Sequence, residues 1–245
     1  MNIPKFLTII YLSTSGLLLS GCAGMPASLD PQSPAAEQIT FLWWVMFWAG
    51  TVIWIVVTIL LMVGLFRRQG KAEAYTPLRE AEHDRTVNRW IVGGGIVMPT
   101  VVLIGLVALT VSALRQIPAT VPSADVVVEV TGHQWWWEVH YPEQDVTLQD
   151  EIRIPAGQPV EVRLTSADVI HSFWVPKLHG KFDLIPGKTH VFVLQANEPG
   201  EYRGQCAEFC GLRHARMTFT VVTMPPEEFT VWLDSQQPSA VNSIP

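Results

Sequence analysis

The chain has 245 residues, and 49% of them are hydrophobic whereas only 16% are charged. This composition is too apolar for an ordinary soluble domain, so it predicts membrane-spanning segments. The three cysteines show no paired pattern, which excludes a disulfide framework, and the net charge of −6 gives no support to nucleic-acid binding.

The N-terminal residues 1–21 predict a secretion signal, because Lys5 is their only charge and most of the following residues are apolar. The sequence Leu-Ser-Gly-Cys that ends at Cys22 resembles a bacterial lipoprotein cleavage site. The resemblance implies cleavage before Cys22 and a lipid on its sulfur. The alternative is a signal that is uncleaved or conventionally cleaved, with Cys22 incidental. One lipid adds little anchoring where two spans follow.

Two uncharged runs predict two transmembrane helices. Residues 22–38 are rich in Ala, Ser and Pro and predict an extended tether. Residues 39–66 and 90–114 then form apolar runs long enough to span a membrane, and the first opens with a tryptophan cluster typical of the interface. Three glycines at 93–95 in the second run indicate either close approach of another helix or a locally flexible helix end.

The segment between the spans, residues 67–89, carries six Lys or Arg side chains against four acidic ones. The tether carries no Lys or Arg. The positive-inside rule therefore predicts a cytoplasmic loop and a helical hairpin, with everything after Arg115 on the periplasmic side of a bacterial inner membrane.

From Val126 onward the pattern changes to short alternating or β-branched runs separated by Pro-Gly turns, which predicts a Greek-key sandwich or barrel over residues 116–236. A helix is expected to open at Pro225–Phe229, and residues 237–245 are expected to be a disordered tail. The predicted strands are Val126–Val130, Trp135–Tyr141, Val160–Thr165, His190–Leu194 and Thr218–Val222.

The stretch 204–217 places two thiols, an imidazole and a thioether in the order Cys-x3-Cys-x3-His-x2-Met. Thiolate and thioether are soft ligands and imidazole also suits copper, whereas zinc has no use for a methionine. A blue-copper site needs one cysteine, so a second one, four residues on, implies that both sulfurs are ligands, and two bridging thiolates can hold two metal ions. The alternative is a disulfide between Cys206 and Cys210, with His214 and Met217 as bystanders.

This stretch resembles the CuA loop of cytochrome c oxidase subunit II. The resemblance extends to the segments 132–137, 168–172 and 183–187 and, with the two spans, covers roughly residues 38–236. It implies a membrane α+β protein in which a two-helix transmembrane hairpin precedes a periplasmic all-β cupredoxin-like Greek-key barrel. No Cys-x2-Cys-His site follows the barrel, so no haem is expected in this chain.

The resemblance also implies the metal ligands. Two copper ions would be held by bridging thiolates and two imidazoles, with Met217 as a weak axial ligand and the carbonyl of Glu208 as a further one. The carboxylate of Glu208 would face a magnesium or manganese site shared with subunit I, because one carboxylate cannot form such a site alone. The implied copper ligands are His171, Cys206, Glu208, Cys210, His214 and Met217.

Three consecutive tryptophans precede the ligands in the sequence. Strand alternation predicts Trp135 and Trp137 on one face and Trp136 on the other, with core packing explaining at least one of them. The resemblance implies that Trp135 lies exposed above the copper site and is the residue through which electrons enter. His133 and Gln134 are interpreted as structural, with His133 near a subunit interface.

The charge distribution predicts a cationic partner. Residues 116–245 hold 16 acidic and 8 basic side chains, a net charge of −8, so this half of the chain is the acidic half. Such a surface can steer a basic protein such as cytochrome c. Asp168, close in sequence to His171, is the candidate docking residue, and an ordinary solvated acidic surface is the alternative.

The resemblance therefore implies a respiratory subunit that accepts electrons from cytochrome c and passes them to haem in subunit I, where oxygen is reduced, with subunit III as a further partner. The alternatives are a copper-free quinol oxidase subunit II and a membrane-anchored copper carrier. One departure stands out: many members carry a Glu near the start of the second span, but residues 90–99 contain no carboxylate. The proton-pathway role is therefore assigned to no residue.

Overall fold

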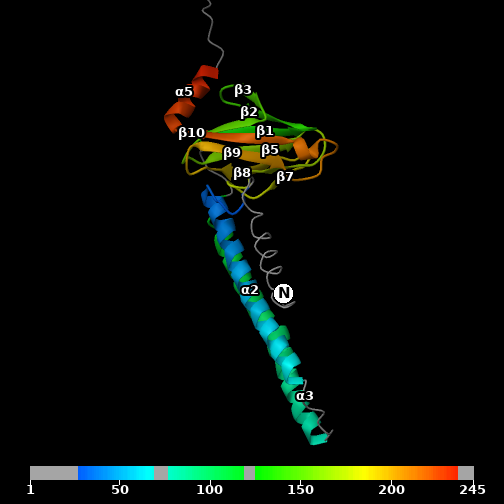
Figure 1. Ribbon diagram of the computed structural model, residues 1–245. Coiled ribbons are helices and arrows are strands. Elements are labelled where there is room, and N and C mark those ends of the chain that lie inside the picture. The colour runs from blue at the N-terminus through cyan, green and yellow to red at the C-terminus, as the bar shows by residue number, and fades with distance from the viewer. Residues whose placement is uncertain (1–26, 69–76, 119–124, 237–245) are drawn as a thin grey trace, which may run out of the picture. The chain divides into compact units, whose positions relative to one another are not determined.

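The computed structural model describes residues 27–68, 77–118 and 125–236 (Figure 1). These divide into two compact units, a helical one over Gln38–Ile117 and a β-rich one that contains the rest. The predicted signal, the lipidation site at Cys22 and the C-terminal tail lie outside the described residues.

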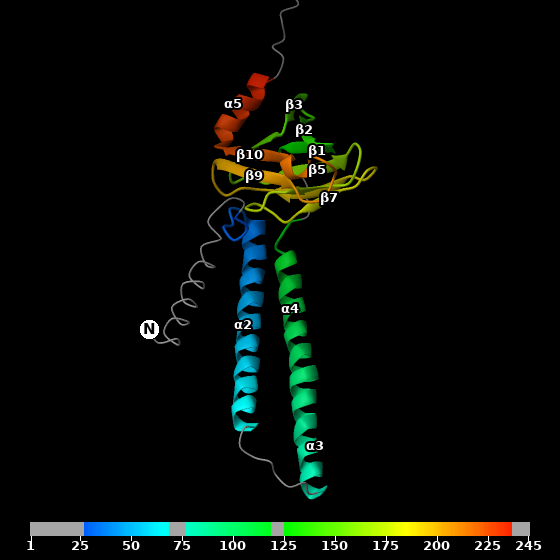
Figure 2. The ribbon, with the colours of Figure 1, turned by 45° about the vertical axis from the view of Figure 1, so that its right-hand side comes forward.

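The helical unit consists of two runs of helix in opposite directions (Figure 2). Its two longest apolar stretches, Pro34–Arg67 and Arg85–Leu114, are each long enough to cross a membrane. Most of their large apolar side chains are exposed, as expected of helices that face lipid. The elements are α2 (Pro34–Arg68), α3 (Pro77–Val92), a π-helical turn η1 (Gly93–Val97) and α4 (Met98–Leu114).

The glycine triplet lies in the π-helical turn, which joins α3 to α4 without a break. Pro99 has no N–H group to donate to the carbonyl of Gly95, and glycines stabilise an α-helix poorly, so the regular ladder relaxes here. The backbone N–H of Met98 instead donates to the carbonyl of Gly93. A β-carbon on any of the three glycines would meet nothing within 4 Å.

The start of α2 belongs to the β-rich unit. Ser33 caps the helix by accepting a hydrogen bond from the N–H of Ala36 at 3.0 Å, and its own hydroxyl donates to the carbonyl of Leu178. The backbone N–H of Gln32 donates to the carbonyl of Lys177 at 2.8 Å, and the carbonyl of Gln32 accepts from the N–H of Asn197 at 2.9 Å. The predicted tether is therefore shorter than expected, because capping and these contacts start the helix at Pro34.

The β-rich unit is a pair of five-stranded sheets with the strand orders β3-β2-β1-β5-β8 and β4-β10-β9-β6-β7. Two pairs, β1 with β5 and β10 with β4, are parallel, and the other pairs are antiparallel. This is the expected cupredoxin-like Greek-key barrel. The strands are β1 (Val127–His133), β2 (Trp136–Tyr141), β3 (Val146–Gln149), β4 (Glu151–Pro155), β5 (Val160–Ser166), β6 (His171–Trp174), β7 (Phe182–Leu184), β8 (His190–Leu194), β9 (Gly200–Cys206) and β10 (Thr218–Met224).

All five predicted strands are present; His190–Leu194 has the predicted ends, three others have one end shifted, and the strand predicted at Val126–Val130 has both ends shifted. Five others were not predicted: β3, β4, β6, β7 and β9. Two of these, β6 and β7, have only four and three residues, and β9 carries glycine and charged residues that are uncommon in strands. The alternation of Ile152 and Ile154 in β4 was a usable signal.

The prediction that Trp135 belongs to a strand with Trp137 was wrong. His133 pairs with Trp136 across the β1–β2 hairpin, so Gln134 and Trp135 are the two residues of its loop. Strand alternation does not extend through a turn. Trp137 is fully buried, and its ring contacts those of Phe173 and Phe219 at centroid distances of 5.9 and 5.1 Å. It is therefore the tryptophan that fills the core.

The predicted C-terminal helix is confirmed as α5 (Pro226–Gln236), which buries Phe229 and Leu233. Trp232 packs against Tyr141 at a centroid distance of 5.6 Å and lies under the guanidinium of Arg153 at 5.0 Å. The buried hydroxyl of Tyr141 donates to the carbonyl of Arg153 (2.8 Å) and accepts from its N–H (2.7 Å). The helix thus seals one side of the barrel.

Candidate metal centre

Sulfur and nitrogen ligands gather where strands β6 and β9 meet. His171 is the first residue of β6 and Cys206 is the last residue of β9, and Phe173 pairs with Cys206 in the sheet. The following loop contains Cys210 and leads through the short helix η2 (His214–Arg216) to Met217, just before β10. The barrel therefore brings together ligands that lie about 35 residues apart in the sequence.

Each thiol has its own set of neighbours. The Sγ atom of Cys206 lies 3.9 Å from Nδ1 of His171 and 3.2 Å from the carbonyl oxygen of Glu208. The Sγ atom of Cys210 lies 3.7 Å from both Nδ1 of His214 and Sδ of Met217. The two Sγ atoms are 3.8 Å apart.

These distances fit shared metal ions. Metal–sulfur bonds of about 2.3 Å and metal–imidazole bonds of about 2.0 Å allow at most about 4.6 Å between two sulfurs on one ion, and about 4.3 Å between a sulfur and a nitrogen. The sulfur–sulfur distance of 3.8 Å and the sulfur–nitrogen distances of 3.9 and 3.7 Å lie below these limits. Two bridging thiolates, each with its own imidazole and a weaker ligand, would suit a pair of copper ions.

The alternative of a disulfide does not fit the structure. A disulfide has an S–S distance of about 2.05 Å, whereas these sulfurs are 3.8 Å apart and both cysteines are free. Met217 lies in the core with 1% of its surface exposed, and its Sδ atom contacts Sγ of Cys210.

The ligand atoms are shielded from water although the loop itself is at the surface. His171, Cys206, Cys210 and Met217 are buried, and His214 is half-buried. Between them Phe209 and Leu212 point outward with 77% and 96% of their surface exposed. Apolar side chains left exposed in this way are typical of a surface that contacts another protein.

The two thiols resist ionising together. Burial raises the pKa of Cys206, but hydrogen bonding with His171 and the neighbouring backbone outweighs burial and leaves this pKa below its ordinary value. Burial and the adjacent charge of Cys206 raise the pKa of Cys210. The pair therefore favours a single negative charge, and a cation bound beside the thiols would favour removal of the second proton.

Asp168 holds the imidazole of His171 through the ring nitrogen that faces away from the thiols. Its Oδ1 atom lies 2.8 Å from Nε2 of His171 and 2.6 Å from the N–H of Val169, and its Oδ2 accepts from the N–H of Gln134 at 2.7 Å. Burial raises the pKa of Asp168, but these hydrogen bonds outweigh burial and hold the pKa below its usual range. With Nε2 donating to Asp168, Nδ1 of His171 is free to bind a metal.

The β1–β2 hairpin loop closes over the cysteine loop. Nε2 of Gln134 and Nε1 of Trp135 both donate to the carbonyl of Cys210, at 2.7 and 3.3 Å. A β-carbon on Gly211, whose φ is +119°, would lie 3.0 Å from Gln134 and 3.2 Å from Trp135. Trp135 thus lies beside the ligands as expected, but it is half-buried rather than exposed, because it packs against this peptide.

Sequence reasoning missed two supporting residues. It interpreted Gln134 only as structural, and it assigned Gly132 no role, although a β-carbon there would touch His171. Both lie inside the Gly-His-Gln-Trp segment, but no pattern in that segment shows what its residues contact. His133, also interpreted as structural, stacks on Trp136 at a centroid distance of 4.3 Å.

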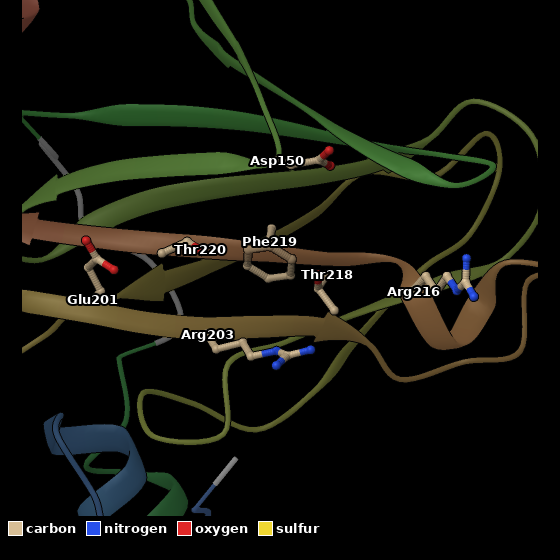
Figure 3. Close-up of a pocket in the computed structure, with 7 residues that line it drawn as sticks. All are labelled: Asp150, Glu201, Arg203, Arg216, Thr218, Phe219 and Thr220. Carbon is tan, nitrogen blue, oxygen red and sulfur yellow. The ribbon is translucent and has the colours of Figure 1, made fainter. Parts of the chain in front are cut away.

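A wide groove lies on the outer side of β9 and β10 (Figure 3). It has a volume of about 610 Å³, and its charged lining residues are two acids and two arginines, whose formal charges cancel. Arg216 is the lining residue that lies among the ligands in sequence, between His214 and Met217. The lining residues are Asp150, Glu201, Arg203, Arg216, Thr218, Phe219 and Thr220.

Residues 144–224 match the family described as the periplasmic domain of cytochrome c oxidase subunit II. Cytochrome c oxidase subunit 2 of Alkalihalophilus pseudofirmus is 32% identical over 94% of this chain and 67% of its own length. Quinol oxidase subunit 2 of Bacillus cereus is 31% identical over 91% of this chain and 77% of its own length.

Among solved structures, the periplasmic domain of cytochrome oxidase subunit II of Bradyrhizobium japonicum is 31% identical. The match covers 48% of this chain and 96% of that one, with a TM-score of 0.45.

The fold and the site define a membrane-anchored protein whose extracellular cupredoxin-like domain carries a His and two-Cys cluster compatible with copper. The chain belongs to the cytochrome c oxidase subunit II family. It is a subunit of a haem–copper terminal oxidase, which implies subunit I as its partner.

Proposed function

We propose that this chain is the subunit of a respiratory cytochrome c oxidase that accepts electrons from cytochrome c and delivers them to haem in subunit I. Oxygen would be reduced in that partner, not here. The observation that carries the proposal is the pairing of each free thiol with its own imidazole: Cys206 with His171, and Cys210 with His214.

The ligands divide into strong and weak ones. The two thiolates would bridge a pair of copper ions, and His171 and His214 would each complete one of them. Met217 and the carbonyl of Glu208 would act as weak ligands that tune the reduction potential. A copper pair held in this way supplies one-electron redox chemistry. The barrel contributes burial, which excludes water from the ligand atoms.

The relatives include subunits of both cytochrome c and quinol oxidases, so the electron donor has to be argued from the site. A copper-free quinol oxidase subunit has no need of two free, buried thiols that each lie 3.7 to 3.9 Å from an imidazole. This favours cytochrome c. A copper carrier would exchange its metal, whereas four of these ligand side chains are buried in a preformed barrel.

Electrons would enter through Trp135, whose indole N–H donates to the carbonyl of the ligand residue Cys210. This contact gives a route of one hydrogen bond from the indole to the ligand loop. The acidic character of residues 116–245 would steer basic cytochrome c toward the site. Asp168 remains the candidate docking residue, although its carboxylate also holds His171.

Two further features of the proposal concern the assembled oxidase. The half-buried Glu208 would contribute its carboxylate to a magnesium or manganese site shared with subunit I, and subunit III would be an additional neighbour. The chain would lie in the bacterial inner membrane with the copper domain on the periplasmic side. Cleavage before Cys22 and its lipidation would complete the mature N-terminus.

The test is copper binding by the full-length chain in detergent. We expect two copper ions per chain and a paramagnetic-resonance spectrum in which one unpaired electron is shared between both. Cys206→Ser and Cys210→Ser should each abolish this spectrum, whereas Cys22→Ser serves as the thiol control and should retain it. A single copper with a blue-copper spectrum in the unaltered chain would contradict the proposal.

A further inference from the structure

Gln134 contacts both halves of the metal centre. Its side-chain amide donates to the carbonyl of Cys210 at 2.7 Å, and its backbone N–H donates to Oδ2 of Asp168 at 2.7 Å. Through its other oxygen Asp168 holds the imidazole of His171 at 2.8 Å. One residue of the β1–β2 hairpin loop is therefore bonded to the cysteine loop and, through one carboxylate, to the histidine from β6.

The direct link between the two halves lies near Cys206, where Phe173 pairs with Cys206 in the sheet and the N–H of Ala207 donates to the carbonyl of Ser172 at 2.9 Å. His171 is fixed at the start of β6, whereas Cys210 lies in a loop between β9 and η2 that has no strand partner of its own. The carbonyl of Cys210 accepts from two donors, and both come from the hairpin loop, Gln134 and Trp135. The bond from Gln134 is the shorter and stronger of the two.

The fit between the two loops is close. The hairpin loop lies against the peptide that joins Cys210 to Gly211, where a β-carbon would be only 3.0 Å from Nε2 of Gln134. The amide of Gln134 therefore packs directly against this peptide, although the residue is exposed to solvent. The position of this carbonyl fixes the backbone from which the Cys210 thiolate projects.

We propose that Gln134 is a positioning residue that sets the distance between the cysteine loop and the imidazole of His171. This inference rests on the proposed copper function, and it assigns the residue no contact with metal. Its side chain acts on Cys210 and its backbone acts on His171 through Asp168. A change in the amide should therefore alter the ligand geometry while leaving all the ligands in place.

Three variants test the role of the amide. Gln134→Met keeps the length of the side chain but removes its N–H donor, and Gln134→Lys keeps a donor on a chain of similar reach. Gln195→Met is the matched control, because Nε2 of Gln195 also donates to a backbone carbonyl, that of Gly157 at 3.1 Å. All variants are made in the full-length chain with Cys22→Ser, so that the two site cysteines are the remaining thiols.

The first measurement uses the metal-free protein and a colorimetric disulfide reagent. Release of the carbonyl should make the cysteine loop more mobile, so Gln134→Met should react several-fold faster than the unaltered site, whereas Gln195→Met and Gln134→Lys should not. This measurement does not depend on copper. It therefore decides the positioning role even if the copper proposal fails.

The second measurement uses the copper-loaded protein. Loss of a residue that orients metal ligands typically weakens metal binding about 10- to 100-fold, and we expect the lower end because Gln134 is exposed to solvent. Copper release to a chelator should accelerate about tenfold in Gln134→Met, with altered copper hyperfine splitting. Gln134→Lys should restore both.

Two results would overturn the inference. One is a Gln134→Met variant that matches the unaltered protein in thiol reactivity, copper release and spectrum. The other is an equal change in Gln134→Met and Gln195→Met, which would indicate a general loss of stability. Failure of the unaltered chain to bind two coppers would instead count against the proposed function alone.

Discussion

The α-carbon of Gly132 lies so close to His171 that a β-carbon there would be 2.9 Å from Cδ2 of the imidazole and 3.1 Å from Cγ. These contacts are shorter than van der Waals separation. Glycine at this place in β1 therefore leaves the room that the imidazole ring of His171 occupies.

Gly132→Ala should displace the imidazole of His171 without unfolding the barrel. The ring is held by Asp168 and buried on all sides, so it can move only by giving up its hydrogen bond. We expect copper affinity to fall by at least the roughly tenfold seen for loss of orienting groups, measured by chelator competition. Gly200→Ala is the control, since a β-carbon there has ordinary contacts of 3.7 Å or more. Equal affinities in the two variants would contradict this.

Trp135→Gln should slow electron transfer from cytochrome c by orders of magnitude while leaving binding and its salt dependence nearly unchanged. Tunnelling needs a short route, which the indole supplies through its contact with the carbonyl of Cys210, and an uncharged side chain contributes nothing to long-range steering. The measurement is stopped-flow reduction of the assembled oxidase. Trp136→Gln is the control, because this neighbouring indole stacks on His133. A rate near that of the unaltered oxidase, with copper intact, would make Trp135 a packing residue.

Asp168→Asn should have two separable effects. Loss of a negative charge near the docking face lowers the association rate of cytochrome c, and this loss shrinks as salt screens the field over about 10 Å or less. Weaker support of His171 alters the copper spectrum at every salt concentration, since the imidazole end of the bond between them is fully buried. Association rates and spectra measured across a salt series separate the two. A change in the spectrum alone would remove Asp168 from the docking role.

Acidification should destabilise the barrel through His179. This ring is buried between Phe182 and Phe192, at centroid distances of 4.9 and 5.4 Å, and burial lowers its pKa below the ordinary value of 6.5. His179 therefore binds a proton more readily in the unfolded chain than in the folded chain. The stability contributed by the neutral ring is complete above about pH 6.5 and is lost as the pH falls, with a slope of at most about 1.4 kcal/mol per pH unit.

His179→Leu should flatten this dependence. The measurement is the thermal unfolding midpoint of the full-length chain, followed by tryptophan fluorescence between about pH 7.5 and pH 5.5, a range that brackets the titration of a free histidine. The control is His140→Leu, because His140 lies at the surface beside the hydroxyl of Thr147 at 3.1 Å. Parallel curves for the unaltered chain and His179→Leu would show that another group is responsible.

The processing of the N-terminus can be checked by mass. If the segment before Cys22 is a lipoprotein signal, the mature chain lacks residues 1–21 and carries added lipid mass. The Cys22→Ser chain should lack the added lipid mass. Intact-mass spectrometry of the purified chain decides this, and an unmodified Cys22 or a retained Met1 would contradict the prediction.

The sequence by itself determined the elements whose signal is local. Uncharged runs long enough to cross a membrane identify the spans, because each transmembrane helix must present apolar side chains over its whole length. The spacing of Cys206, Cys210, His214 and Met217 predicts a metal-binding loop, because one loop carries four side chains of suitable chemistry. Strands such as Val160–Ser166 followed from alternation, which reflects one buried and one exposed face.

Only the tertiary structure decided what surrounds those ligands. Asp168 contacts Gln134, and Gln134 contacts Cys210, across 34 and 76 residues of sequence, distances over which no periodic pattern carries information. The hairpin register placed Trp135 in a loop, because His133 pairs with Trp136. Gly132 matters only because β1 passes against the first residue of β6. Contacts of this kind arise from the packing of the two sheets, so the residues that support the ligands become visible only when the barrel is folded.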